Sequence, residues 1–449
     1  MPLTRQQKGC LAAMLIGAAA HRSGIVKPQR KDRKPSERRD RKQAMSDIAA
    51  LDDRRFKKRY RMCKARHAEL LFEIRPDLER DEQKAANSAG SPVFPYLQLC
   101  IGLRMVSGGS YLDIADAHKV HESTVNPITW RVINAINLRI KIVNFPFSNV
   151  RKLDEHAKTF FARCQELPGT VAAGDGVAFG IECPEAHEVG GDLKSQFSRK
   201  GFYTYSVLAF CDALLRIMAV HCDSCGSTND GLQYVGSWLH QTIEEGKLPP
   251  QFHVVLDEAF RCSQQELTNH SRPKSPQVLS ESKDAFNFYL SLHRCNIERC
   301  FGLFVWRWGI FWRPIRTSFG SIKDIVACCS RLHNWCQEEV ERWKIFEASR
   351  PNAGFDAAVL ESIQEHDEED LVWSRTNERV QPSEILQPPG APLLFIPGGA
   401  GASRQGQRND LDKTSKRAVF TTDMERRGLK RPTHSADAQR KRLRMAGKN

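Results

Sequence analysis

Three acidic residues in the middle of the chain have the surroundings of a catalytic carboxylate set. Asp175 interrupts the apolar run 169–181, Asp257 follows the short apolar run 252–256, and Glu298 lies in a helical stretch. Carboxylates from two strands and a helix can converge on Mg²⁺ or Mn²⁺, because hard cations prefer oxygen ligands. Two such ions activate water or a 3′-hydroxyl and stabilise the leaving oxygen of a phosphodiester. The pattern predicts a metal-dependent nuclease with Asp175, Asp257 and Glu298 as catalytic acids.

Each acid also has an ordinary structural interpretation. Asp175 lies between Gly174 and Gly176, a setting typical of a turn. Asp257 and Glu298 could be a cap or a surface charge. The order of the three acids and the elements that carry them favour the catalytic interpretation.

The elements around these acids are predicted from apolar periodicity. Residues 169–181 and 252–256 read as buried strands, and residues 197–223 read as a two-stranded hairpin. A capped helix opens at Asn229 or Asp230, and residues 287–308 form a long helix on which Arg294 and Glu298 share a face. The predicted fold class is α/β, a mixed sheet flanked by helices, preceded by an all-helical domain.

The helical domain contains two features suited to DNA. Residues 51–71 read as one amphipathic helix with basic side chains at Arg54, Arg55, Lys57, Lys58 and Arg59. Residues 108–136 have the rhythm of a helix-turn-helix, with a first helix over 111–118 and a second that starts near Ser123, its expected N-cap. Ser123, Thr124 and Asn126 would then meet base edges. An ordinary three-helix packing unit explains the same pattern equally well.

Charge is concentrated at the two ends of the chain. The net charge is +14, while residues 22–66 carry 18 basic against 6 acidic side chains and residues 426–449 carry 9 against 1. Such basic ends bind polyanions by releasing condensed counterions, so DNA is the expected partner. The clusters Arg426-Arg427, Lys430-Arg431 and 440–444 also suit a bipartite nuclear import signal, which predicts a nuclear protein.

Other classes of protein are less well supported. No apolar run reaches the length needed to span a bilayer, so no membrane partner is expected. The apolar stretch 10–20 could mimic a signal-peptide core, but a densely basic tract follows it at once. The 14 cysteines lack framework spacing, and the pair Cys222 and Cys225 beside His221 would need further ligands to form a zinc module.

The chain is thus predicted to have four parts. Residues 1–50 form a basic disordered arm, 51–150 the helical DNA-binding domain, 151–345 the nuclease domain, and 346–449 a mostly disordered tail with a basic end.

The motifs together resemble the Harbinger (PIF-type) transposases and their domesticated relatives, over about residues 56–336. The matching segments, in order, are FKKRYRM, GGSYLDIADAHKVHESTV, AAGDGVAF, SRKGFYTYSVLAFCDA, GSTND, VVLDEAF, NIERCFG and LHNWC. The resemblance implies an RNase H-like fold with its triad at Asp175, Asp257 and Glu298, and Asp230 as a further metal ligand. It also implies a Myb-like partner protein, and an oligomer is possible.

Two departures from that family keep a second hypothesis open. The family usually has Asp-Gly-Thr-His at the first acid, where this chain has Val177 and Ala178 after Gly176. It usually has Gly-Tyr after the second acid, where this chain has Glu258 and Ala259. Neighbouring groups orient metal ligands, so the alternative is a domesticated, catalytically weak nuclear DNA-binding protein that keeps the transposase fold.

Overall fold

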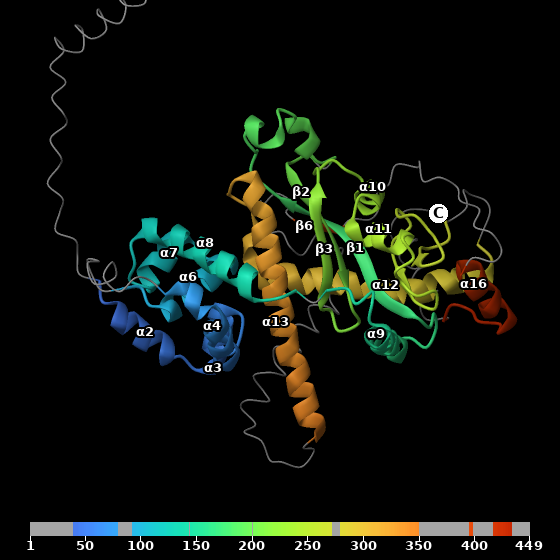
Figure 1. The fold of residues 1–449 in the computed structure, drawn as a ribbon, viewed down its shortest axis with the longest axis horizontal. Helices are drawn as coiled ribbons and strands as arrows, with labels where there is room; N and C mark the ends of the chain where they lie inside the picture. The colour runs from blue at the N-terminus through green and yellow to red at the C-terminus, as the bar shows by residue number, and fades with distance from the viewer. Residues whose placement is uncertain are drawn as a thin grey trace, which may run out of the picture.

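The computed structural model combines a group of helices with a mixed α/β layer structure (Figure 1). It describes residues 39–79, 92–142, 144–199, 201–271, 279–349, 395–397 and 416–432. The rest of the predicted basic arm and tail lies outside the described residues. Within these ranges, no helix is both long and apolar enough to cross a membrane.

The described residues of the N-terminal group form six helices. They are α2 (Arg41–Ala49), α3 (Asp53–Tyr60), α4 (Lys64–Leu78), α6 (Pro95–Val106), α7 (Tyr111–Ala117) and α8 (Glu122–Arg139). The prediction of one helix over 51–71 is wrong, because Arg61 adopts a left-handed φ of 65° and ends α3. Cys63 then caps α4, and the turn lets the buried rings of Phe56 and His67 meet edge to face. α2 lies within residues 1–50, which were expected to be a disordered arm, so that expectation does not hold for residues 41–49.

The helix pair α7 and α8 lies at the predicted helix-turn-helix, with a different cap. α7 ends at Ala117, one residue earlier than predicted, and Lys119 in the turn has a left-handed φ of 51°. α8 begins at Glu122, and its N-cap is His121, whose Nδ1 accepts from the backbone N–H of Ser123 at 3.2 Å. Ser123 is therefore inside the helix and not its cap, which corrects the prediction.

Within the described residues the sheet has six strands, five of them in the order β3-β2-β1-β4-β5. These five are β1 (Thr170–Gly180), β2 (Thr204–Cys211), β3 (Ile217–Ser224), β4 (His253–Val255) and β5 (Glu266–Leu267). β1, β2 and β3 are antiparallel neighbours, whereas β4 is parallel to β1 and β5 to β4. β6 (Phe395–Pro397) pairs with the end of β1. The predicted strand around Asp175, the hairpin and the short strand before Asp257 are all confirmed.

Helices cover both faces of this sheet (Figure 1). On one face, Ala173 and Val177 of β1 join the core of α12 (Glu281–Arg307) and α13 (Ile322–Ser349). On the other, Ala172 joins residues of α9 (Val150–Arg163), α10 (Asp230–Val235) and α11 (Trp238–Glu244). The remaining elements are the 3-10 helices η1 (Ala186–Val189), η2 (Leu193–Gln196), η3 (Gly309–Trp312) and η4 (Phe319–Ser321).

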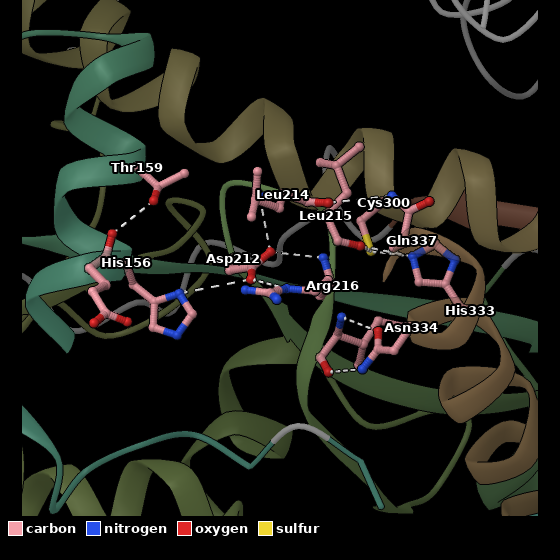
Figure 2. A network of polar contacts seen from close by, with 12 residues as sticks. His156, Thr159, Asp212, Leu214, Leu215, Arg216, Cys300, His333, Asn334 and Gln337 are labelled. Atoms are coloured by element: carbon pink, nitrogen blue, oxygen red, sulfur yellow. Dashed lines mark hydrogen bonds and ion pairs between the residues drawn. The ribbon is translucent and has the colours of Figure 1, made fainter. Parts of the chain in front are cut away.

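A buried polar network fixes the turn between β2 and β3 (Figure 2). Asp212 Oδ1 accepts from the backbone N–H groups of Leu214 and Arg216, and its Oδ2 pairs with Arg216 Nε at 2.7 Å. From α13, Asn334 brackets Ile217, accepting from its N–H at 2.7 Å and donating to its carbonyl at 2.8 Å. Both oxygens of Asp212 are thus used within the fold, so this buried acid is a structural one.

The same helix α13 joins the sheet to the N-terminal helices. Arg331 Nε donates to the Ile140 carbonyl at 2.8 Å, and Asn137 of α8 donates to the Asp324 carbonyl at 2.9 Å. The Arg66 guanidinium lies 3.9 Å from the ring centroid of Trp335. The helical group and the sheet therefore share one continuous core.

A helix near the C-terminus packs against α12. α16 (Lys416–Arg426) buries Met424, and Thr421 Oγ1 lies 2.9 Å from His270 Nε2. After it, Arg427 forms two hydrogen bonds to Glu166 at 2.7 and 2.8 Å, and Lys430 pairs with Glu281. The expectation of a mostly disordered tail does not hold for this segment.

Candidate catalytic site

β1 places Asp175 in the interior of the fold, on the face that packs against α12. Successive side chains alternate between the faces of a strand, so Gly174 and Gly176 face α10 and α11 instead. Their missing side chains make room for close neighbours. A Cβ at position 174 would lie 2.2 Å from the ring of Phe210, and one at 176 would lie 2.5 Å from Asp230 Oδ1. The two glycines therefore serve close packing across the strand and do not form a turn.

The three predicted catalytic acids surround one guanidinium group, that of Arg294. Arg294 Nη1 lies 2.8 Å from Glu298 Oε1 and 3.5 Å from Asp175 Oδ2. Its Nε lies 3.8 Å from Asp257 Oδ1. β1, the end of β4 and α12 thus bring Asp175, Asp257 and Glu298 together, as the sequence predicted for their elements.

The three acids differ strongly in how far their side chains are buried. The exposed fraction of the side chain is 1% for Asp175, 20% for Asp257 and 41% for Glu298. Asp175 therefore forms the floor of the site, and the side of Glu298 faces solvent.

Asp230 approaches the same region from the opposite face of β1. It is the first residue of α10, whose N-cap Asn229 accepts from the backbone N–H of Leu232. Its carboxylate rests against Gly176, and its charge interacts with that of Asp257. Asp230 is thus a neighbour of the triad, whereas the ion pairs of Arg294 within the described residues are with Asp175, Asp257 and Glu298.

The electrostatics of the site show an excess of negative charge. Burial raises the pKa of Asp175 well above its ordinary value, and the nearby charges of Asp257 and Asp230 raise it further. Arg294 and the hydrogen bond from the Gly176 N–H act in the opposite direction. Burial and Asp257 also raise the pKa of Asp230, while Arg199 lowers it. One guanidinium in the centre does not neutralise four neighbouring carboxylates.

This donor set fits a divalent cation by its chemistry. All four side chains offer carboxylate oxygens, the ligands that Mg²⁺ and Mn²⁺ prefer, and their charge is only partly compensated. In the described part of the chain, no three acidic, histidine or cysteine side chains are arranged to hold a metal ion directly. At the predicted site, the Arg294 guanidinium occupies the space between the acids. The same finding gives no support to a zinc site at Cys222 and Cys225.

The residues that replace the usual family neighbours provide no polar support. Val177 is buried in the core on the α12 side, and Ala178 follows it on the other face. The carbonyl of Ala259 lies 2.8 Å from the place of a Cβ at Gly231, so this loop packs tightly on α10. The side chains of Val177, Ala178 and Ala259 cannot orient a carboxylate by a hydrogen bond.

The predicted DNA-contacting residues lie on the surface of the helical group. The basic cluster of α3 consists of Arg54, Arg55, Lys57, Lys58 and Arg59, all exposed except Lys57, which is half-buried. The start residues of α8 are Ser123 and Asn126, which are exposed, and Thr124, which is half-buried. Tyr60 at the end of α3 lies 3.3 Å from Nε2 of His118 at the end of α7, so the two regions belong to one packed unit.

Two features of the site were not predicted from the sequence. Arg294 was placed on the face of Glu298, but its contacts with Asp175 and Asp257 are visible only in three dimensions. Arg199, which acts on Asp230, lies in the segment SRKGF and was not given a role. The basic pair Arg199-Lys200 within this segment is the signal in the sequence that could have indicated a role.

Comparison with known families assigns this arrangement to a class. Residues 175–334 match the family model of the DDE superfamily endonucleases, a match that spans all four acids. The resemblance to a transposase-type nuclease is therefore confirmed for this region. Among curated proteins, the chain is similar to "Protein ALP1-like" of Arabidopsis thaliana, at 23% identity over 302 residues. That alignment covers 64% of this chain and 71% of the relative. No solved structure matches the chain.

Proposed function

We propose that this chain is a divalent-metal-dependent DNA endonuclease or transposase with an RNase H-like catalytic domain. The observation that carries the proposal is the meeting of Asp175, Asp257 and Glu298 around one point, within the region that matches the endonuclease family. The strand order, with β1 central and β4 parallel to it, is consistent with that fold.

Each acid has a role set by its position. Asp175, Asp257 and Glu298 would hold Mg²⁺ or Mn²⁺, with Asp230 supporting from the other side of β1. When bound, such ions activate water or a 3′-hydroxyl and stabilise the leaving oxygen. Asp175 must give up its proton to act as a ligand, because its buried carboxyl favours the neutral form. The exposed side of Glu298 receives the DNA strand, while the apolar core behind Asp175 keeps bulk water away.

DNA binding is assigned to the helical group. The basic cluster of α3 would contact phosphates, which position the duplex, and the start residues of α8 would read bases in the major groove. Support comes from their exposure and from the Tyr60–His118 contact that joins the two regions.

The alternative is a catalytically weak, domesticated DNA-binding protein. Two observations favour it: the apolar Val177 and Ala178 beside the first acid, and the guanidinium of Arg294 between the acids. The two proposals differ only in whether the acids still perform chemistry.

A plasmid-nicking assay in Mn²⁺ or Mg²⁺ separates these proposals. We expect nicking by the full chain, and its loss in Asp257→Asn, because one anionic ligand is removed from a half-buried strand end. Duplex binding by the variant should persist, since the basic residues are elsewhere. Nicking at the wild-type rate by Asp257→Asn would refute the assignment of the second acid. A wild-type chain that binds DNA but never nicks it would favour the alternative.

The location and partners follow from the same proposal. A DNA-cutting protein acts in the nucleus, and the basic C-terminal clusters would supply the import signal. Arg427 and Lys430 of that signal are engaged in ion pairs with Glu166 and Glu281. A Myb-like partner protein and an oligomeric state stay expectations from the family resemblance.

A further inference from the structure

The strongest unexplained feature of the molecule is a cation buried among acids that are proposed to bind another cation. We propose that Arg294 is an internal counterion, which holds Asp175, Asp257 and Glu298 together in the metal-free protein and is displaced from Asp175 and Asp257 when a divalent ion binds. This inference rests on the proposed function, because it assumes that the acids are metal ligands.

The contacts of Arg294 with the three acids differ in length. Only its contact with Glu298, at 2.8 Å, has the length of a good charged hydrogen bond. The contact with Asp175 is at the outer limit, at 3.5 Å, and Nε lies 3.8 Å from Asp257 with no hydrogen bond although it is buried. Arg294 is thus held at Asp175 and Asp257 mainly by charge, and little hydrogen bonding is lost when it leaves them.

The charge of the site explains why a counterion is needed. Without Arg294, the three acids would lose the cation that contacts all of them, and they would repel one another whenever they are ionised. A buried charge left without a partner is strongly destabilising. A divalent ion would supply twice the charge of the guanidinium, and the three carboxylates would have to close around it once Arg294 has moved away.

The position of Arg294 on α12 provides a route for its displacement. Arg294 and Glu298 are four residues apart on one helix face, and Glu298 is the most exposed of the three acids. The long side chain can turn toward solvent around Glu298 while its backbone stays in place. In that position its planar guanidinium suits the phosphate groups of a DNA strand.

Mn²⁺ binding to the full chain tests this inference directly. We would compare wild type with Arg294→Gln and Arg294→Lys, measuring Mn²⁺ dissociation constants and the Tm with chelator or with Mn²⁺. The matched control is Arg299→Gln, which removes the same charge from an exposed position on the same helix. In Arg294→Gln we expect Mn²⁺ to bind about tenfold more tightly or better, because a competing charge a few ångströms away is gone.

The Tm values should show that Arg294 stabilises the three acids in the metal-free protein. Arg294→Gln should have a lower Tm than wild type in chelator, and Mn²⁺ should restore most of that loss. The Tm of Arg294→Lys in chelator should lie between those of wild type and Arg294→Gln, since a single ammonium cannot span three carboxylates. Arg299→Gln should leave the Mn²⁺ dissociation constant unchanged.

The result that overturns the inference is Mn²⁺ affinity that is unchanged or weaker in Arg294→Gln. That outcome would make Arg294 an ordinary structural residue while wild-type Mn²⁺ binding and nicking leave the proposed function intact. If Arg294→Gln does not fold, Arg294→Lys decides the question by the same criterion. A different result would refute the proposed function itself: neither wild type nor any variant would bind Mn²⁺. The proposed role of Arg294 would then be refuted as well.

Discussion

The two glycines that flank Asp175 offer a sharp test of how the site is built. An alanine at position 176 would place its Cβ 2.5 Å from Asp230 Oδ1 and 3.0 Å from its Cγ. Non-bonded heavy atoms prefer about 3.5 Å or more, so the carboxylate must retreat by about 1 Å. A displacement of this size in a catalytic constellation can lower the rate by about 100-fold. We therefore expect Gly176→Ala to lower Mn²⁺-dependent nicking by about 10- to 100-fold.

The stability of Gly176→Ala should change little. Asp230 is the end of a short side chain at a helix start and can rotate, and an alanine in a compatible backbone position stabilises a protein by about 0.4–1 kcal/mol through the unfolded state. Gly174→Ala is the matched control, because its Cβ would lie 2.2 Å from the buried ring of Phe210. Overpacking of this kind costs about 1–3 kcal/mol or more.

The two variants should therefore separate activity from stability. Denaturant unfolding and plasmid nicking, with the rate expressed per folded molecule, measure both for each variant. Gly174→Ala should be less stable but nick normally, and Gly176→Ala should be stable but slow. A Gly176→Ala protein that nicks as fast as wild type would show that Asp230 has no part in the chemistry.

Three further predictions concern the rest of the chain. Neutralising the basic cluster of α3 should weaken binding to every duplex and flatten the slope of log K against log salt by about 0.9 per lost phosphate contact. Replacing the start residues of α8 should only relax the preference for one DNA sequence. If that preference is unchanged in a salt titration of the α8 variant, α7 and α8 are only a packing unit. Burial lowers the pKa of His67 and His118 from 6.5 to about 4. The folded state therefore keeps its full stability above pH 6.5 and should lose about 3 kcal/mol per histidine as the pH falls to 4. In denaturant unfolding, the stability of His118→Gln should depend less steeply on pH than that of wild type, and an equal dependence would contradict this prediction. A fluorescent fusion that lacks residues 426–449 should stay outside the nucleus, and its nuclear entry would refute a required signal there.

The acids of the site could be predicted because each depends on local sequence. Asp257 follows a short apolar run that forms a buried strand in almost any context, and Asp230 lies beside Asn229, a residue type typical of helix starts. The periodicity of residues 287–308 likewise predicts the helix that carries Glu298. For these three acids, the local sequence predicts the strand or helix that carries the residue and the place of the residue at its end or along its face.

The features that were missed depend on distant parts of the chain. Arg61 interrupts the predicted helix in a left-handed conformation that arginine rarely adopts, and its neighbours Tyr60 and Met62 are both buried in the core. His121 takes the capping role expected of Ser123, because its ring Nδ1 accepts from the backbone N–H of Ser123. The contacts of Arg294 join residues 119 positions apart, which no local pattern reveals.

The docking of α16 has a consequence for the synthesis of the protein. Lys430 pairs with Glu281, a residue that precedes it by 149 positions, and Met424 belongs to the core that includes α12. At roughly 5–20 residues per second, the ribosome needs about 10–30 s to pass from one partner to the other. During this interval the side of α12 that α16 covers is exposed on the nascent chain. The region around the sheet therefore completes its packing only after α16 has been made.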